Sequence, residues 1–343
     1  MRKLLNTLYI TNPEAYLARD GENIVVKVAD KEVGRRPIHI LENIVCFHYT
    51  GMNGALLRLC CDHGVGVSFL DQHGNFCGRV QGKVNGNVLL RRAQYRLADE
   101  EIKALQIAKH FILGKLVNCK KTINRGLRDH ADKVDVNLLN QVAEKMSQAI
   151  EHVKTVASFD SLRGIEGETA RAYFQGFNEL ILQQKENFYF QERSKRPPRD
   201  NVNAMLSYAY TLLAVDMRNA LETVGLDPYV GFLHSDRPGR AGLALDMMEE
   251  LRAYLGDRFV LTLINRKQVT EKSFLKKENG GVLLEAEMRK EFITAWQKRK
   301  QDEIEHPYLQ EKVEIGLIPY VQAMLMARFI RGDLDAYPPF FVS

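Results

Sequence analysis

The chain has 343 residues, of which 45% are hydrophobic and 27% are charged, which excludes a disordered protein and suggests two globular domains. Lysine and arginine number 48 against 43 aspartates and glutamates, so the net charge of +5 permits a polyanionic partner without requiring one. Five cysteines in no regular framework predict a reduced, cytoplasmic protein. No run approaches the ~18 apolar residues of a membrane span, so we expect no membrane partner.

Residues 1–90 form the first predicted domain, in which short apolar runs alternate with turn residues. Residues 16–19 and 24–28 flank Asp20-Gly21-Glu22-Asn23, a pattern typical of a hairpin. One short helix is predicted from Asn53 to about Asp62, with Asn53 as its N-cap. Residues 91–100 are predicted as a linker that enters helical territory. Further strands are predicted at 38–40, 44–47, 65–70 and 76–80.

Residues 101–343 form the second predicted domain, in which apolar residues recur with helical spacing. Gly280-Gly281 lies between two apolar runs and indicates a small hairpin, and the aromatic residues of 337–341 are expected to dock on the body. The predicted fold class is therefore α+β, a β-rich domain followed by an all-α domain. Helices are predicted at 99–128, 137–157, 167–184, 203–224, 242–255, 285–299 and 315–331.

Glu166 is unusual because it is an acid on the apolar stripe of a predicted helix. It lies on the same helical face as Ala170, Tyr173 and Phe174, which follow it in the sequence. A carboxylate on a buried face needs a cation, a helix N-terminus or a metal ion to offset its desolvation. Two interpretations follow: Glu166 is a metal ligand, or it is a first-turn acid that interacts with the helix dipole.

His234 ends an apolar run and is followed by a loop and then by a helix that carries Asp246 and Glu249. These two acids are three residues apart, so they share one face of that helix. The alternatives are a solvated acidic face and a core histidine. The acidic face also carries two small residues that would leave room for a cation or a substrate backbone, Gly242 and Ala253.

Two carboxylates and a neutral imidazole suit Mg²⁺ or Mn²⁺, which prefer oxygen ligands and tolerate one nitrogen. A second group of residues contains the ligand types of a zinc site, but it lacks the usual spacing of paired cysteines. We interpret its cysteines as core residues and keep zinc as the alternative. This group is Cys60, Cys61, Asp62, His63, His73 and Cys77.

Basic residues are frequent around these acids. Basic side chains next to a dication site fit a phosphodiester substrate, because they hold the backbone while the metal ion activates the phosphorus. The alternative for each of them is a solvated helix end or loop. The candidate DNA-binding residues are Arg237, Arg240, Arg193, Lys195, Arg196, Arg199 and Lys267.

Four sequence blocks in this order resemble the CRISPR-associated spacer-acquisition integrase, the Cas-one family. The resemblance extends over nearly the whole chain, and residues 2–9 look most like the type I-C branch. The blocks are Gly164-Ile165-Glu166-Gly167 with Tyr173-Phe174, residues 200–208, Gly231-Phe232-Leu233-His234, and Leu245-Asp246-Met247-Met248-Glu249.

The resemblance implies a domain organisation and an assembly. Residues 1–90 would be a dimerisation and DNA-contacting domain, and residues 101–343 a metal-dependent catalytic domain. Asymmetric homodimers would flank a dimer of the small ferredoxin-fold Cas-two protein in a heterohexamer. This complex would bind double-stranded DNA and insert it at the CRISPR repeat. The family's aromatic wedge for the duplex end has three candidates, Tyr9, Tyr16 and Tyr49.

The resemblance also implies residue roles. Glu166, His234 and Glu249 would be the ligands of the divalent metal, and Asp246 would support the site. Arg237 would face DNA phosphates. The chain has Asp-x-x-Glu where some members have Asp-x-x-Asp, which leaves open whether Asp246 or Glu249 ligates the metal directly.

The hypothesis is a metal-dependent DNA integrase and endonuclease in which Glu166, His234, Asp246 and Glu249 are catalytic. A DNA 3′-hydroxyl attacks a target phosphodiester, and Mg²⁺ or Mn²⁺ stabilises the charge that develops. The first alternative is a general metal-dependent nuclease on branched DNA. The second is a non-catalytic DNA-binding scaffold in which the acids are structural.

Overall fold

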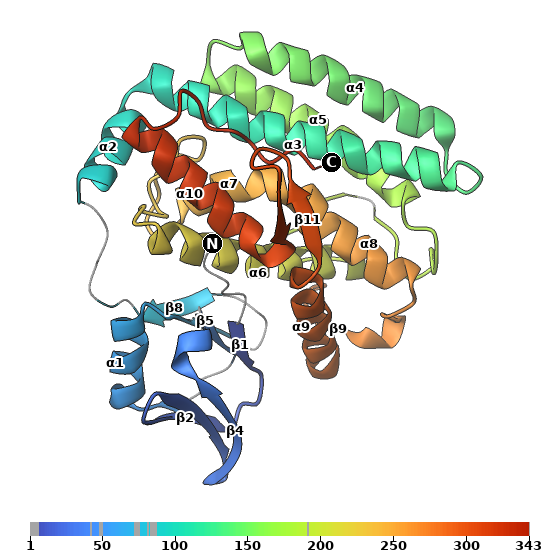
Figure 1. Ribbon diagram of the computed structural model, residues 1–343. Helices are drawn as coiled ribbons and strands as arrows, with labels where there is room; N and C mark the ends of the chain where they lie inside the picture. The colour runs from blue at the N-terminus through green and yellow to red at the C-terminus, as the bar shows by residue number, and fades with distance from the viewer. Residues whose placement is uncertain are drawn as a thin grey trace. The chain divides into compact units, whose positions relative to one another are not determined.

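The computed structural model describes residues 7–41, 43–47, 51–71, 76–80, 82, 88–190 and 192–342. The chain divides into two compact units (Figure 1). Unit 1 consists of Met1–Asn87, Lys290–Ile304 and Val313–Ile318, and unit 2 consists of Val88–Arg289, Glu305–Lys312 and Pro319–Ser343. Strands dominate the N-terminal part of unit 1 and helices dominate unit 2, which confirms the predicted α+β class.

Unit 1 contains two four-stranded sheets. In one sheet, with the order β1-β5-β7-β8, the first three strands are parallel and β8 is antiparallel to β7. The other has the order β4-β3-β2-β6 and contains the predicted hairpin, in which β2 and β3 are antiparallel. The strands are β1 Thr7–Ile10, β2 Ala15–Asp20, β3 Asn23–Val28, β4 Lys31–Pro37, β5 Asn43–Phe47, β6 Gly51–Met52, β7 Gly66–Leu70 and β8 Phe76–Val80.

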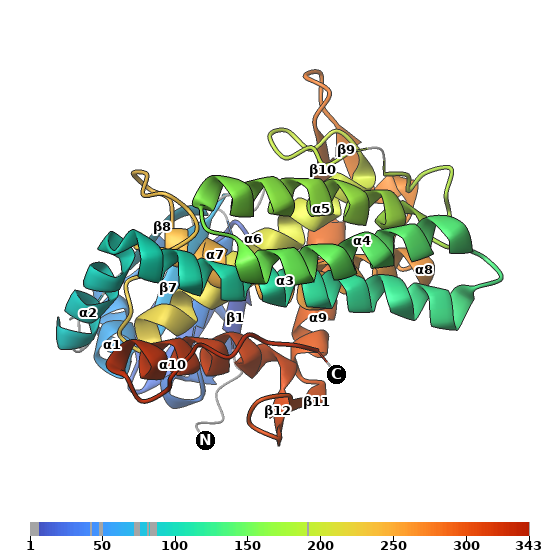
Figure 2. The same ribbon diagram turned by 90° about the horizontal axis from the view of Figure 1, so that it is seen from above.

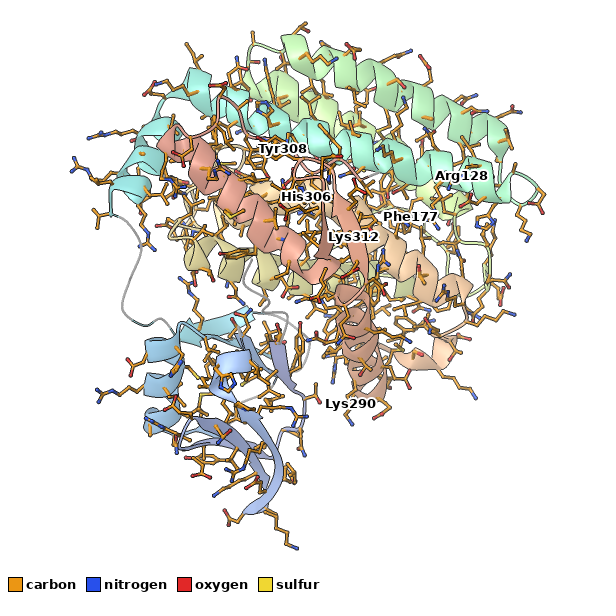
Figure 3. The ribbon with its side chains drawn as sticks, viewed as in Figure 1. Arg128, Phe177, Lys290, His306, Tyr308 and Lys312 are labelled. Carbon is orange, nitrogen blue, oxygen red and sulfur yellow. The ribbon has the colours of Figure 1, made fainter. Side chains whose placement is uncertain are left out.

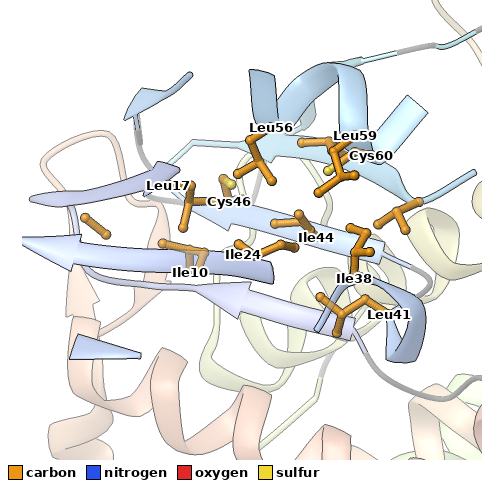
Figure 4. Packing of buried hydrophobic residues seen from close by; sticks show 13 residues of the cluster. Ile10, Leu17, Ile24, Ile38, Leu41, Ile44, Cys46, Leu56, Leu59 and Cys60 are labelled. Carbon is orange, nitrogen blue, oxygen red and sulfur yellow. The ribbon is translucent and has the colours of Figure 1, made fainter. Parts of the chain in front are cut away.

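The core of unit 1 lies between these strands and α1 (Gly54–His63), as Figure 4 shows. Asn53 caps this helix by accepting a hydrogen bond from the Leu56 amide at 2.8 Å, as predicted. The strand predicted at 38–40 is wrong, because Ile38–Ile40 forms one 3₁₀ turn. Pro37 ends β4, and the turn carries Ile38 into the core.

Unit 2 is built mainly from helices, with the predicted hairpin between β9 (Phe274–Lys276) and β10 (Val282–Leu284). Its helices are α2 Val88–Asp99, α3 Glu101–His130, α4 Val136–Thr155, α5 Phe159–Glu179, α6 Asn201–Thr223, α7 Gly242–Leu251, α8 Arg258–Asn265 and α10 Ile318–Arg331. The helix α9 Ala286–Lys300 belongs mostly to unit 1, and the paired strands β11 Glu303–His306 and β12 Glu311–Glu314 contain residues of both units.

α3 is the long helix around which the site is arranged. It packs against α4, α5 and α7, and both views show α3, α4 and α5 side by side (Figures 1 and 2). Gly114 permits the approach to α7, since a Cβ atom there would lie 2.7 Å from Cβ of Glu250. The residue after this glycine, Lys115, is thereby brought next to the acids of α7.

Three helix boundaries differ from the predictions in ways that affect the site. Residues 88–99, which include most of the predicted linker, form α2. α5 begins at Phe159 rather than at 167, because Ser158 caps it by accepting from the Ser161 amide. α7 ends at Leu251, and a π-helical segment, Arg252–Asp257, connects it to α8. π-Helical turns occur frequently at functional sites.

The C-terminal residues dock on unit 2 as predicted. Tyr337 and Phe340 are fully buried, and the Glu250 carboxylate accepts hydrogen bonds from the Tyr337 hydroxyl and the Phe340 amide. Gln322 of α10 donates to the same carboxylate through its amide nitrogen, and its Oε1 accepts from Nε2 of His306, a residue labelled in Figure 3. No helix in the described part of the chain has the length and apolarity needed to cross a bilayer.

Candidate metal centre

Glu166 and Glu249 come from different helices and share one cation. Lys115 of α3 forms an ion pair with Oε1 of Glu166, and its Nζ lies 2.9 Å from Oε2 of Glu249. The Glu249 side chain is 5% exposed and that of Glu166 is 34% exposed, so the pair lies at the edge of the interior. Two carboxylates in such a place are held together only if positive charge compensates them.

Glu166 lies inside the first half of α5, not in its first turn. The interpretation of Glu166 as a first-turn acid is therefore wrong, because the dipole effect falls off within that turn. The earlier start of α5 includes Gly164, whose missing side chain would meet no atom within 4 Å. An exposed glycine of this kind weakens a helix by only ~1 kcal/mol, which the cap and the packing of α5 offset.

Glu249 has a second cationic partner, Arg252, which follows it on the next turn. Nη1 of Arg252 lies 2.9 Å from Oε1 of Glu249. Burial by itself raises the pKa of Glu249, but the charges of Arg252 and Lys115 outweigh it and lower the pKa to about 2. His234 adds to this lowering, so its ring is near enough to act on Glu249. Glu249 is thus a carboxylate that stays ionised although it is buried.

Asp246 is fully buried and binds the loop that carries His234. Its Oδ2 accepts from the amides of Phe232 at 2.7 Å and Leu233 at 2.9 Å. Its Oδ1 accepts from the amide of His234 at 3.1 Å and lies 2.5 Å from Nδ1 of the same ring. With Nδ1 occupied in this way, Nε2 is the ring nitrogen that is left for a ligand.

Two glycines allow this loop to reach Asp246. A Cβ atom on Gly231 would lie 2.6 Å from Oδ2 of Asp246, and one on Gly242 would lie 2.8 Å from the carbonyl oxygen of Tyr229. The prediction that Gly242 leaves room for a cation or substrate is therefore wrong, because the backbone of residues 229–231 fills that space.

The donor set fits a divalent cation, although its members are not gathered as ready ligands. Among the described residues, no group of three His, Cys, Asp or Glu side chains could hold a metal ion as it stands. Oε2 of Glu249, however, is buried and has no hydrogen-bond partner in the described part of the chain. Lys115 stands at ion-pair distance from this oxygen without hydrogen-bond geometry. Such an orphaned carboxylate oxygen next to a second carboxylate is a ligand that Mg²⁺ or Mn²⁺ can use.

A cavity of about 590 Å³ opens beside Lys115 and Glu166. The buried Tyr173 and the half-buried Tyr210 line it and donate to Asp257 at 2.8 Å and 2.5 Å. Burial raises the pKa of Asp257 to about 6, against these hydrogen bonds. The basic residues that line the cavity are Lys115, Arg171, Arg193, Lys195 and Arg252.

The predicted DNA-binding residues fall into two groups. Arg193 is engaged by the fold, because its guanidinium donates to Asn203 and Ser207 and lies over the ring of Tyr210. Lys195 is exposed at the cavity. The other five lie on exposed or half-buried loops away from the cavity lining: Arg196, Arg199, Arg237, Arg240 and Lys267.

Sequence reasoning missed Lys115, although a signal was present. Lys115 has buried residues on both sides along its helical face, with Phe111 four residues before it and Cys119 four residues after it. A lysine in the middle of an apolar stripe needs an anionic partner, just as an acid there needs a cation. The same test that singled out Glu166 would have found it.

The alternative zinc group forms no metal-binding cluster among the described residues. Cys60 is fully buried, and this burial raises the pKa of its thiol to about 12. Cys77 is exposed, and Nε2 of His63 pairs with Glu22 at 2.9 Å. His73 lies outside the described residues. A buried thiol with a raised pKa is inert, as expected of a core cysteine.

Similarity to known proteins shows the family to which the chain belongs. The family model for CRISPR associated protein Cas1 matches residues 8–298. This chain belongs to the Cas1 family. CRISPR-associated endonuclease Cas1 1 of Chlorobaculum tepidum is 48% identical over 340 residues, which cover 99% of each chain. CRISPR-associated endonuclease Cas1 2 of Rhodospirillum rubrum is 47% identical over 345 residues, with 99% of each chain covered.

The Cas1 fold is equally clear. A Cas1 protein from Thermotoga maritima superposes with a TM-score of 0.80 over 97% of this chain and 99% of that chain, at 20% identity. As a Cas1 protein, the chain is a DNA endonuclease and integrase of CRISPR spacer acquisition, which confirms the predicted function and enzyme class.

Proposed function

We propose that Glu166, His234 and Glu249 bind the divalent cation of this Cas1 protein and that Asp246 positions His234. The observation that carries this proposal is the division of labour between the two acids of α7. The Asp246 carboxylate is taken up by three loop amides and by Nδ1 of His234. Oε2 of Glu249 is buried without a hydrogen bond and lies beside the cation that it shares with Glu166. This division favours Glu249 over Asp246 as the direct ligand.

Mg²⁺ or Mn²⁺ is the proposed cofactor, since both accept two carboxylates and one imidazole. When bound, such an ion supplies Lewis-acid stabilisation of the charge that develops on the phosphoryl group and its oxygens. The chain itself does the positioning: Asp246 fixes the ring of His234 and its free Nε2. Arg252 holds the other oxygen of Glu249 and keeps that carboxylate in one orientation.

The proposed substrate is double-stranded DNA, both the incoming spacer and the CRISPR repeat. Two arginines of the loop after His234, the exposed Arg237 and the half-buried Arg240, would contact its phosphates. Lys195 at the cavity, with the exposed Arg196, Arg199 and Lys267, would extend this contact. Arg193 would act by shaping the cavity, because its Nη1 and Nη2 already donate within the fold.

The assembly follows the same proposal. A Cas6-RT-Cas1–Cas2 complex contains a chain of the same fold, at a TM-score of 0.82, which supports a Cas2 partner for this chain. We propose a homodimer through the domain of residues 1–90, and a heterohexamer with Cas2. We also propose that the chain belongs to the type I-C branch and is located in the cytoplasm.

An aromatic residue of the first domain is proposed to wedge the end of the DNA duplex. Of the candidates for this wedge, Tyr16 is 45% exposed, and Tyr49 lies outside the described residues.

An integration assay tests the proposal. The protein, with and without its Cas2 partner, is incubated with a labelled duplex and a plasmid that carries a leader and repeat, in Mn²⁺ or Mg²⁺. We expect joined product from the native protein and a loss of about 100-fold or more in Glu166→Ala. Glu168→Ala is the matched control, because this acid of the same helix is exposed and pairs with Lys145 instead.

Two outcomes would contradict the integrase site. Cleavage without joining, even with the partner present, would indicate a general nuclease. Salt-sensitive DNA binding with neither product would indicate a scaffold in which the acids are structural.

A further inference from the structure

Lys115 is the cation that lies between two of the proposed metal ligands, Glu166 and Glu249. It contacts Oε1 of Glu166 on one side and Oε2 of Glu249 on the other. Its side chain is 11% exposed and extends from the buried face of α3. With Arg252, Lys115 brings the charge of this group to zero, since two cations face two carboxylates. These four side chains therefore have no net charge without a metal ion.

A divalent cation cannot simply be added to this arrangement. Binding between Glu166 and Glu249 would place a double positive charge against the ammonium of Lys115, and like charges in contact disfavour each other strongly. Arg252 holds the far oxygen of Glu249 and so can stay. Lys115 is the cation that blocks the near oxygens of both carboxylates.

Lys115 is also the cation that can move. It donates one hydrogen bond, to Oε1 of Glu166, whereas its contact with Oε2 of Glu249 is an ion pair without hydrogen-bond geometry, so a single directional bond has to break before it moves. Its four-carbon stem is flexible, and the cavity of about 590 Å³ lies at its side. Gly114 keeps α3 against α7, so the main chain of Lys115 stays in place while the ammonium moves.

We propose that Lys115 is a built-in counter-cation: it holds Glu166 and Glu249 together in the metal-free protein and leaves them for the cavity when a divalent cation binds. The inference rests on the proposed function, because it takes these two acids as ligands. It makes Lys115 a positioning residue that sets metal affinity. It also explains why Glu166, His234 and Glu249 are not gathered as ready ligands while the lysine stands between two of them.

The test is the affinity of the full-length protein for Mn²⁺ alone, measured by calorimetry or by electron paramagnetic resonance of the free ion. Lys115→Met removes the competing charge, so we expect Mn²⁺ to bind about tenfold more tightly or better, the effect of one charge in contact. In the presence of a chelator, the same variant should unfold at a lower temperature than the native protein. Saturating Mn²⁺ should raise its unfolding temperature by more than it raises that of the native protein.

Two further variants complete the design. Lys115→Arg keeps the charge and grips carboxylates with a fork, so we expect it to bind Mn²⁺ more weakly than the native protein. It also keeps the test valid if Lys115→Met does not fold. Lys145→Met is the matched control, because Lys145 pairs with the exposed Glu168 of the same α5, and its Mn²⁺ affinity should be unchanged.

The outcomes separate this inference from the proposed function. If Mn²⁺ binding is lost in Glu249→Gln but is no tighter in Lys115→Met and no weaker in Lys115→Arg, the metal site stands and the role of Lys115 is overturned. If the native protein binds no Mn²⁺ that depends on Glu249, even in Lys115→Met, the proposed site itself fails.

Discussion

At the scale of single residues, Asp246 and Glu249 are the same kind of group in two different environments. Asp246 is fully buried and receives the hydrogen bonds of the loop, including that of the His234 ring. Glu249 is nearly as buried, but it is balanced by the charges of Lys115 and Arg252. A carboxylate whose lone pairs are used by amides orients its neighbours, whereas one that is paired with a flexible lysine can exchange that cation for a metal ion.

This difference predicts the results of two isosteric substitutions. Glu249→Gln should abolish measurable Mn²⁺ binding, because it removes the charge of a direct ligand. Asp246→Asn should weaken binding by about 10- to 100-fold, the range typical of a residue that orients a ligand. Mn²⁺ titration of both variants is the measurement, with Glu168→Gln as the control for an exposed acid. Equal losses in the two variants would show that Asp246 ligates the metal itself.

At the scale of secondary-structure elements, the site depends on how closely α3 approaches α7. Gly114 sits at the contact, where a Cβ atom would lie 2.7 Å from Cβ of Glu250 and 3.3 Å from Cβ of Pro339. Real Cβ atoms do not come this close, so any larger residue would push the two helices apart. The distance between Lys115 and Glu249 would then grow as well.

Gly114→Ala should therefore destabilise the protein by about 1–3 kcal/mol, because the strain of overpacking exceeds the gain in helix propensity. Gly164→Ala, on the exposed side of α5, should instead stabilise the protein by up to about 1 kcal/mol, since nothing lies within 4 Å of the new methyl group. Urea unfolding, followed by the helical circular dichroism signal, compares the two variants. A stabilising effect of Gly114→Ala would refute the close approach.

At the scale of the whole chain, the C-terminal residues return to the same helix that carries the proposed ligands. Tyr337 and Phe340 bind the Glu250 carboxylate, and Asn118 of α3 donates to the carbonyl oxygens of Glu250 and Phe340 at 2.7 Å each. Burial raises the pKa of Glu250 to about 7, although hydrogen bonds from Tyr337, Gln322 and the Phe340 amide act in the opposite direction. The contact between the C-terminal residues and α7 therefore contains a titrating group, the Glu250 carboxyl.

The raised pKa of Glu250 predicts how stability depends on pH. Between pH 4.5, its ordinary pKa, and pH 7, the folded protein keeps a proton that the unfolded chain has released. The stability due to the protonated group is thus complete below pH 4.5 and is lost as the pH rises through 7, by about 3 kcal/mol in all. Glu250→Gln has no such proton. As the pH rises from 4.5 to above 7, the free energy of unfolding of the native protein should therefore fall relative to that of Glu250→Gln.

Urea unfolding of the native protein and Glu250→Gln at pH 5 and pH 8 measures this effect. Glu168→Gln is again the control, because its exposed carboxyl should leave the pH dependence unchanged. A constant difference between the native protein and Glu250→Gln at both pH values would contradict a buried proton on Glu250.

The sequence by itself determined the fold class and most helices, and it supplied the four residues of the site, which stay a proposal. Local signals were sufficient there, such as the Asn53 cap, the hairpin of β2 and β3, and an acid on the apolar stripe at Glu166. The predictions of a strand at 38–40 and of a start of α5 at 167 were wrong. Pro37 in the first case and the Ser158 cap in the second outweighed the apolar patterning.

Only the tertiary structure decided which charges meet. Lys115, Glu166 and Glu249 stand on three helices, and no spacing along the chain relates them. Their contact depends on the close approach at Gly114, and the binding of His234 to Asp246 depends on Gly231 and Gly242. Periodicity reports which face of a helix is buried, but it carries no information about which other helix covers that face. Which charges pair depends on the contact between two such helices. This pairing distinguishes Asp246, which orients His234, from Glu249, which can exchange Lys115 for a metal ion.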